Sequence, residues 1–326
     1  MYRQPKLLCT AITAGVAFLL SASAMAADPQ SFAITGFISP ETVVHDPLTD
    51  LYLVSNVGGA PLTVNHGFIS RVSPDGTVQD LRWIEDGVNG ATLHGPKGLW
   101  LHRSELYVAD VDTLRIFNRF TGAPVRNIPI PNPFADPAPP VGAFGALFLN
   151  HVVVANDGTA YISDQLNSAI FKVDAAGNAS LLASGPQLGN PDGMMLDEEE
   201  LTWVTFFGHE VRRMTRSGSI ITEATLPPVD VSGLALGPIP LPPGALLLDG
   251  YAHCDGYLLV SSWVTGQVYR IGRSGTEIGV IAHVTSLRDD ASGADGPAKI
   301  GIDQKRGRLL IPLFQAGKLL IQQFED

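Results

Sequence analysis

Cysteine is nearly absent from this sequence. The 326 residues include only Cys9 and Cys254, and Cys9 lies in an N-terminal segment that we expect to be removed. One remaining cysteine cannot form an internal disulfide, so burial of apolar side chains must stabilise the fold.

Charged residues, and basic ones in particular, are also scarce. They make up 16% of the chain, and 21 Lys and Arg stand against 32 Asp and Glu, which gives a formal net charge of −11. An acidic surface repels nucleic-acid phosphates and anionic lipid headgroups, so we expect neither as a partner. Because 45% of the residues are hydrophobic, the chain is expected to bury a sizeable core.

Common catalytic motifs and long apolar runs are missing as well. The sequence has no G-x-S-x-G elbow, no P-loop and no H-E-x-x-H motif. The apolar run at residues 7–20 is too short to span a bilayer. Arg3 and Lys6 precede this run and Ala24-Met25-Ala26 follows it, a pattern typical of a secretory signal with its cleavage site.

We therefore expect a signal peptide at residues 1–26 and one mature domain at residues 27–326. The mature protein would be periplasmic or secreted, without membrane attachment after cleavage. The lack of disulfides favours the bacterial periplasm over a eukaryotic secretory route.

The sequence is rich in turn residues, with 34 Gly and 24 Pro, and it repeats. A short apolar strand recurs at intervals of 42 to 56 residues, ending at Val54, Val108, Ile162, Val204, Val260 and Ile311. A hairpin signal with a Gly at its tip follows several of these strands, as at residues 71–76 and 270–275. Four strands with their turns need roughly 40 to 50 residues, so the repeat predicts an all-β, six-bladed propeller with four-stranded blades.

The two ends of the chain favour a closed ring over an open solenoid. The sixth repeat stops at residues 319–324 and leaves no room for a fourth strand, while residues 33–37 precede the first repeat. Pairing this N-terminal strand into the last blade would remove an exposed edge. Two Pro-rich insertions, residues 129–140 and 227–243, read as surface loops, either as plain linkers or as a lid over a pocket.

The repeat also aligns polar residues. Counting back 11 to 13 positions from the end of each repeated strand gives Glu41, Lys97, Asn150, Asp192, Asp249 and Lys299. The inner strands of a propeller run parallel along its channel, so these residues should meet at one mouth. Converging carboxylates need a counter-charge, and oxygen ligands select hard ions. Calcium is the expected ion, with magnesium, manganese and zinc as alternatives, but Lys97 and Lys299 could instead neutralise the carboxylates directly.

Turn chemistry offers a different explanation for some of these residues. Asp192 lies in Pro191-Asp192-Gly193 and Asp249 in Asp249-Gly250, both ordinary turn signatures in which Asp binds its own backbone. The shared position in the repeat favours the site over the turns.

The pattern resembles the senescence marker protein-30/gluconolactonase family of six-bladed propellers. The resemblance rests on residues 40–46, Leu149-Asn150-His151, Pro191-Asp192-Gly193 and Asp249-Gly250, and on a C-terminal run, residues 298–303 and 310–314, that resembles an exported bacterial branch. It implies a divalent metal held by Glu41, Asp192 and Asp249, with Asp249 also as base and Asn150 contacting substrate. Lys97, His151 and Lys299 are further candidates for substrate binding.

The expected function is hydrolysis of lactones or related esters, with the metal polarising the carbonyl and activating water. The expected partner is a small lactone or sugar acid. The alternative is a non-catalytic propeller that binds a small ligand or a protein through the same face. No feature of the sequence predicts an oligomeric state.

Overall fold

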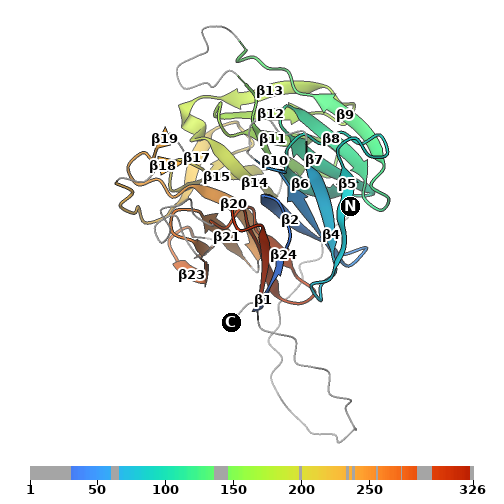
Figure 1. The fold of residues 1–326 in the computed structure, drawn as a ribbon. Coiled ribbons are helices and arrows are strands. Elements are labelled where there is room, and N and C mark those ends of the chain that lie inside the picture. Colours follow the sequence, from blue (N-terminus) through green and yellow to red (C-terminus); the bar gives the residue numbers. More distant parts are fainter. Residues whose placement is uncertain are drawn as a thin grey trace, which may run out of the picture.

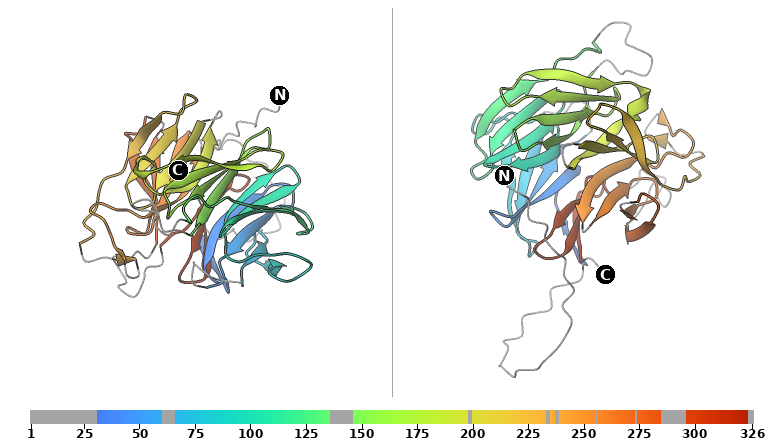
Figure 2. Two further views of the ribbon diagram at one scale, coloured as in Figure 1. Left: turned by 90° about the horizontal axis from the view of Figure 1, so that it is seen from above. Right: turned by 180° about the vertical axis from the view of Figure 1, so that it is seen from behind.

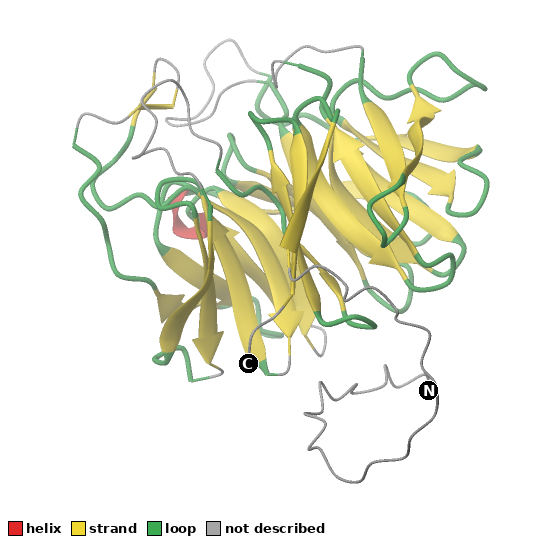
Figure 3. Ribbon diagram, turned by 60° about the horizontal axis from the view of Figure 1, so that its bottom comes forward, coloured by secondary structure: helices red, strands yellow, loops and turns green. Residues whose placement is uncertain are grey.

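Six antiparallel sheets of four strands surround a central axis (Figure 1), which confirms the predicted all-β, six-bladed propeller. The computed structural model describes residues 31–59, 66–135, 146–197, 200–232, 235–236, 239–254, 256–272, 274–284 and 296–323. Within these ranges the only helix is a short 3-10 turn, η1 (Pro186–Leu188), and strands dominate (Figure 3). The predicted signal segment, residues 1–26, lies outside the described residues.

The first three blades follow one another along the chain, each running from an inner to an outer strand. Blade 1 contains β2 (Pro40–Asp46), β3 (Leu51–Asn56), β4 (Phe68–Val72) and β5 (Val78–Glu85). Blade 2 contains β6 (Pro96–His102), β7 (Glu105–Asp110), β8 (Thr113–Asn118) and β9 (Pro124–Pro129). Blade 3 contains β10 (Leu149–Val154), β11 (Ala160–Asp164), β12 (Ala169–Val173) and β13 (Ala179–Ser184).

The other three blades complete the ring, as the views from above and behind in Figure 2 show. Blade 4 contains β14 (Pro191–Asp197), β15 (Glu200–Thr205), β16 (Glu210–Met214) and β17 (Ile220–Thr225). Blade 5 contains β20 (Leu248–Cys254), β21 (Tyr257–Ser262), β22 (Gln267–Gly272) and β23 (Ile278–His283). Blade 6 contains β24 (Gly301–Asp303), β25 (Arg308–Leu313), β26 (Lys318–Gln323) and β1 (Ser31–Thr35), while β18 (Ala235–Leu236) and β19 (Ile239–Pro240) form a small separate hairpin.

The N-terminal strand closes the ring, as the sequence predicts. Strand β1 pairs antiparallel with β26, with Ile34 opposite Leu319 and Phe32 opposite Ile321. The strand covers residues 31–35, slightly earlier than the predicted residues 33–37. Because β1 is the outer strand of blade 6, the two ends of the described chain are joined by backbone hydrogen bonds and the last blade is complete.

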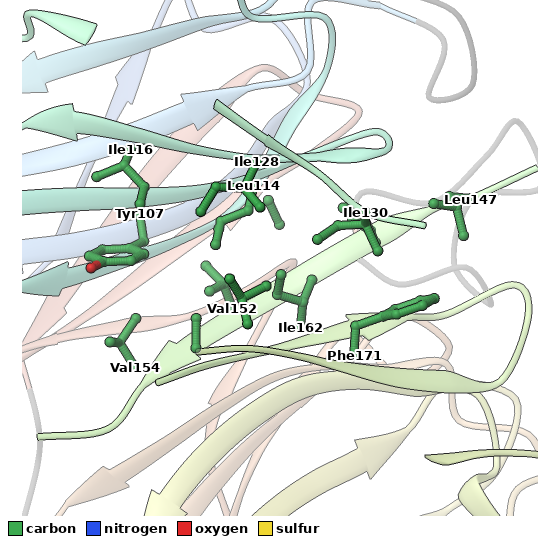
Figure 4. Close-up of a cluster of buried hydrophobic side chains, with 14 of the residues drawn as sticks. Tyr107, Leu114, Ile116, Ile128, Ile130, Leu147, Val152, Val154, Ile162 and Phe171 are labelled. Carbon is green, nitrogen blue, oxygen red and sulfur yellow. The ribbon is translucent and has the colours of Figure 1, made fainter. Parts of the chain in front are cut away.

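Apolar side chains fill the spaces between neighbouring blades. Between blades 2 and 3, Tyr107 and Leu114 from one sheet face Val152, Ile162 and Phe171 from the next (Figure 4). Similar buried clusters join each of the other neighbouring pairs. Strands alternate their side chains between two faces, so a sheet that is packed on both sides needs apolar residues on both. These contacts fix the angle of each blade around the axis.

A β-bulge recurs at the start of the inner strand in five blades. The register between the first two strands shifts between Pro40 and Val43 in blade 1 and between Pro191 and Met194 in blade 4, and blades 2, 3 and 5 show the same shift. A bulge leaves residues out of the ladder and re-aims their side chains. The predicted mouth residues of these blades lie inside the bulges.

Glycine follows the mouth residue where neighbouring inner strands come close. A Cβ on Gly193 would lie 2.4 Å from the Asp249 carbonyl oxygen, and one on Gly250 would lie 2.6 Å from the Ile300 nitrogen. Only Gly permits such an approach. The Asp-Gly pairs that resemble simple turn signatures are therefore also needed for the contact between inner strands.

An apolar cluster, here called the roof, lies next to the mouth. It includes Val57, Phe206, Trp263 and Phe314, which follow the second strands of blades 1, 4, 5 and 6. The described residues Val231 and Leu241 belong to the second Pro-rich insertion and pack into the roof as well, together with Ala298, Leu247, Ala245 and Val264. Much of the first insertion, residues 136–140, lies outside the described residues. In the part of the chain that is described, no helix is long and apolar enough to cross a membrane.

Candidate functional site

Four of the six polar residues aligned by the repeat converge on the side-chain nitrogen of a fifth, Lys299. Lys299 Nζ lies 2.8 Å from Glu41 Oε1, 2.8 Å from Asp192 Oδ1, 2.7 Å from Asp249 Oδ1 and 3.0 Å from Asn150 Oδ1. We call these five residues the central cluster. They come from blades 1, 3, 4, 5 and 6, so five sheets contribute to one contact region.

The first and last blades are tied together by their backbones at this point. Lys299 donates its backbone N–H to the Glu41 carbonyl oxygen at 2.8 Å, and Thr42 and Lys299 form a parallel bridge. Lys299 precedes β24, while the other members of the cluster are the second residues of their inner strands. Equal positions in parallel inner strands explain why side chains far apart in sequence meet.

The three ammonium donors of Lys299 are all used. Nζ donates hydrogen bonds to Glu41, Asn150 and Asp249. Asp192 Oδ1 is equally close but accepts no hydrogen bond, so its contact with Nζ is an ion pair alone. An ammonium has three N–H groups and no more. Nζ therefore has no N–H group left for Asp192 Oδ1.

Two residues that directly follow the second strand of their blades hold the far oxygens of the aspartates. Gln165 Nε2 donates to Asp192 Oδ2 at 2.7 Å, and Trp263 Nε1 donates to Asp249 Oδ2 at 2.8 Å. Both follow the second strand of their blades, where the other blades carry different residue types. The repeat does not reveal them, because the residue type at this position changes from blade to blade. They fix each carboxylate plane, so that one oxygen of each faces Lys299.

Burial and mutual repulsion set the protonation of the cluster. Burial raises the pKa of Asp249 to about 7, an effect that the Lys299 charge opposes and the Glu41 charge reinforces. Burial and the Asp249 charge raise the pKa of Asp192 well above its usual range. Burial lowers the pKa of Lys299, but the charges of Asp192, Asp249 and Glu41 outweigh it and hold the pKa well above its usual range. Lys299 is thus a permanent cation, while burial and neighbouring negative charges favour the protonated forms of both aspartates.

Lys97 is the second buried lysine at the mouth, but it lies apart from the carboxylates. Among the described residues its Nζ has one hydrogen-bond acceptor, the Gly95 carbonyl oxygen at 3.3 Å, and it lies 4.2 Å from the centre of the Phe148 ring. The side chain is only 2% exposed. Burial lowers the pKa of Lys97 to about 8, although the Glu41 charge opposes the shift. This ammonium retains two donors for a further partner.

His151 follows Asn150 and is also buried. Its Nδ1 accepts the Met194 backbone N–H at 3.1 Å. Burial, with a further contribution from the Lys299 charge, lowers the pKa of His151 to about 3. The ring is therefore neutral at neutral pH, with its proton on Nε2. A neutral His151 can donate a hydrogen bond to a ligand, but it is a weak proton acceptor.

Serines in alternate blades fix the bulges that carry the site. Ser55, Ser163 and Ser261 each follow the aligned strand-end residue of blades 1, 3 and 5. Ser163 Oγ accepts the His151 N–H and donates to the Asp192 carbonyl oxygen, both at 3.0 Å. Ser55 bonds in the same way to Thr42 and Lys97, and Ser261 to Gly250 and Ala298. Each serine thus joins its own inner strand to that of the next blade.

A divalent metal does not fit the central cluster in this arrangement. The ammonium of Lys299 occupies the centre of the four oxygens, where an ion coordinated by Glu41, Asp192 and Asp249 would lie. Among the described residues, no group of three or more His, Cys, Asp or Glu side chains forms a site that could hold a metal ion. The geometry therefore matches the second reading of the sequence, in which a lysine neutralises the carboxylates, and Lys299 is that residue.

The predicted site residues therefore fall into two groups. Glu41, Asn150, Asp192, Asp249 and Lys299 share the central cluster. Lys97 and His151 lie at the same end of the inner strands with contacts of their own. The roles in catalysis, substrate binding and metal binding that the sequence suggests for them stay predictions.

Comparison with solved structures gives the same fold. The chain is similar to a streptogramin B lyase with a TM-score of 0.57 and 13% identity, over 90% of this chain and 97% of the other. It is similar to a virginiamycin B lyase from Staphylococcus aureus with a TM-score of 0.53 and 13% identity, over 89% and 98%. The calcium-binding protein regucalcin from Agrobacterium tumefaciens gives a TM-score of 0.59 and 13% identity, over 89% and 92%. At these identities the likeness establishes the fold alone.

No curated protein sequence matches the chain. Residues 143–241, which contain blades 3 and 4 with Asn150 and Asp192, match the family model described as the SMP-30/Gluconolactonase/LRE-like region. Together with the ring of six blades, this match supports an SMP-30/gluconolactonase/LRE-like six-bladed propeller.

Proposed function

We propose that the protein hydrolyses a lactone or a related ester of small size at the mouth of its channel, without a metal in the central cluster. The observation that carries the proposal is the convergence of four oxygen side chains from four blades on the Lys299 ammonium. The family match over residues 143–241 supports the substrate class. Titratable groups with strongly shifted pKa values in one buried cluster are typical of acid–base catalysis.

In this proposal Asp249 is the general base. Its carboxylate is held by Trp263 on one oxygen and by Lys299 on the other. Burial raises the pKa of Asp249 to about 7, which suits proton transfer near neutral pH. Asp249 would take a proton from water as the water oxygen attacks the ester carbonyl carbon.

Lys97 is the donor proposed for the oxygen that becomes negative. Lys299 has no donor left, whereas Lys97 has two beyond its bond to Gly95. As the tetrahedral intermediate collapses, the ring C–O bond breaks and the leaving oxygen takes the proton back from Asp249. The product is the open hydroxy acid, and Asp249 returns to its starting state. Asn150 and the neutral His151 would orient the substrate.

The test is turnover of a panel of aldonolactones and simple esters by the purified protein after treatment with EDTA. We expect hydrolysis that persists without added metal and falls about 100-fold or more in Asp249→Asn, because general base catalysis typically contributes that much. Asp174→Asn changes a partly exposed aspartate in an outer hairpin of blade 3 and serves as the matched control. Absence of turnover on the whole panel, or full activity in Asp249→Asn, would contradict the proposal.

A non-catalytic role is the second candidate, and one observation favours it. Glu41, Asn150, Asp192, Asp249 and Lys299 are at most 6% exposed, so the central cluster lies away from solvent. In that case the central cluster is structural, and Lys97, which is itself 2% exposed, is the cation that a small anionic ligand would contact. Calorimetric binding of sugar acids by the wild type, lost in Lys97→Met and without any turnover, would favour this candidate over hydrolysis.

We also propose that the protein is exported. The basic start, the apolar run at residues 7–20 and the small residues at 24–26 support this proposal. N-terminal sequencing of the protein recovered from a periplasmic fraction should begin near Ala27. Recovery of the full-length chain from the cytoplasm would contradict export.

A further inference from the structure

We infer that the Lys299 ammonium is a tethered replacement for a divalent cation, and that removing this amine uncovers a calcium site. The inference concerns what neutralises the central cluster, and it holds whether or not the protein is an enzyme. Its first support is geometric: oxygens from Glu41, Asn150, Asp192 and Asp249 surround one nitrogen at 2.7 to 3.0 Å. Four oxygens pointing at one centre form a partial coordination shell.

The size of this shell indicates which ion it would accept. Calcium binds oxygens at about 2.3–2.6 Å and tolerates irregular geometry, whereas magnesium requires about 2.0–2.1 Å and a near-ideal octahedron. The oxygens around Nζ need to move inward by a few tenths of an ångström for calcium and by much more for magnesium. The remaining calcium ligands would be waters in the space that the lysine side chain leaves.

The charges at the mouth favour a divalent over a monovalent ion. Three carboxylates face one another there, and the fixed cations nearby are Lys299 and Lys97. Of these two cations, Lys299 alone forms ion pairs with them, so three carboxylates share one ammonium. Replacing a single positive charge with a double one would compensate more of the negative charge of these carboxylates.

The carboxylates are also pre-positioned, since their orientation does not depend on Lys299 alone. Gln165 holds Asp192 and Trp263 holds Asp249, each through the oxygen that faces away from Nζ. The hydrogen bond from the Lys299 backbone N–H to the Glu41 carbonyl oxygen does not use the Lys299 side chain. The shell should therefore persist when the amine is removed.

The experiment is calcium titration of the purified, EDTA-treated protein by isothermal calorimetry, with thermal unfolding in parallel. We expect no calcium binding to the central cluster of the wild type, and one bound calcium with a raised melting temperature in Lys299→Ala. Lys299→Met is the matched control, because its side chain fills the same space without a charge and should not bind calcium. Adding Glu41→Gln to Lys299→Ala should weaken calcium binding about tenfold or more, because a charged ligand is lost.

Calcium binding by the wild type that Glu41→Gln abolishes would overturn the inference, as would a folded Lys299→Ala that binds no calcium. Binding of potassium in place of calcium would refute the divalent preference. If Lys299→Ala folds only with an added cation, recovery of its circular dichroism by calcium supports the inference, and no recovery counts against it. None of these measurements depends on turnover, so a failure of the proposed hydrolase activity leaves them unaffected.

Discussion

Lys97 and Lys299 enter the mouth from matching positions of blades 2 and 6, yet they are held very differently. Lys299 donates three hydrogen bonds and pairs with three carboxylates, so its pKa is raised despite burial. Lys97 has one long hydrogen bond and an aromatic ring as neighbours, and burial lowers its pKa to about 8. Two lysines at the same position of the repeat thus have different roles. Lys299 is a permanent counter-ion, whereas the Lys97 ammonium uses one of its three N–H groups. We conclude that Lys299 neutralises the carboxylates of the central cluster, whereas Lys97 forms a single hydrogen bond within the described part of the chain.

The largest expected effect is on stability when each lysine loses its charge. Lys299→Met leaves three buried carboxylates without their cation, so the free energy of unfolding should fall by about 3–5 kcal/mol at pH 7. Lys97→Met removes a buried ammonium with little compensation and should be neutral or stabilising. Denaturant unfolding of both variants measures the difference. Equal losses in the two variants would contradict the distinction between the lysines.

The pH dependence of stability should separate the lysines with a somewhat smaller effect. Burial lowers the pKa of Lys97 in the folded protein to about 8, whereas the pKa of an unperturbed lysine is 10.5. Between these pH values the unfolded chain holds a proton that the folded protein has released, so stability rises with pH. The wild type should gain about 3 kcal/mol relative to Lys97→Met across this window. The charged groups that act on Lys97 are Glu41, Asp110, Asp164 and Lys299. If the free energy of unfolding of the wild type and of Lys97→Met changes in parallel with pH, Lys97 keeps an ordinary pKa.

A smaller effect is expected at Trp263, which has no counterpart beside Lys97. Its indole N–H bonds a buried carboxylate, and hydrogen bonds to charged groups contribute about 2 kcal/mol. Trp263→Phe should lose roughly that much and raise the pKa of Asp249 further, because a donor to the charged form is removed. Carboxyl titration by NMR checks the direction of the shift. A lowered pKa would mean that Trp263 does not hold Asp249.

The smallest expected effect tests whether the backbone segments that carry the two lysines are held equally strongly. Ser55 donates to the Lys97 carbonyl oxygen and Ser261 to that of Ala298, beside Lys299. Ser55→Ala and Ser261→Ala should each cost about 1 kcal/mol, since each removes equivalent neutral hydrogen bonds. If one of these variants lost clearly more stability than the other, the different behaviour of the two lysines would arise from their backbone positions and not from their side-chain contacts.

Most of the fold could be predicted from the sequence because a propeller repeats. Hydrophobic alternation and glycine turns recur once in each blade, and the short sixth repeat identifies the closing strand. The register of the mouth residues follows from the same repeat, so Glu41, Asn150, Asp192 and Asp249 could be expected to meet.

The identity of the counter-charge could not be predicted in the same way. The sequence pattern is compatible with either a lysine or a metal ion as the positive charge between the carboxylates. The direction of a long, flexible lysine side chain depends on the packing around it, which the repeat does not define. Trp263 and Gln165 escaped notice because they stand in loops where neighbouring blades carry other residues. By contrast, Ser55, Ser163 and Ser261 recur at one repeat position and could have been found in alternate blades.

The most direct test is a crystal structure of the wild-type protein grown with calcium in the solution. We expect Lys299 Nζ within hydrogen-bonding distance of Glu41, Asn150 and Asp249, without an ion between the carboxylates. A calcium ion bound by Glu41, Asp192 and Asp249, with Lys299 turned away from them, would contradict the conclusion that the lysine is the resident cation.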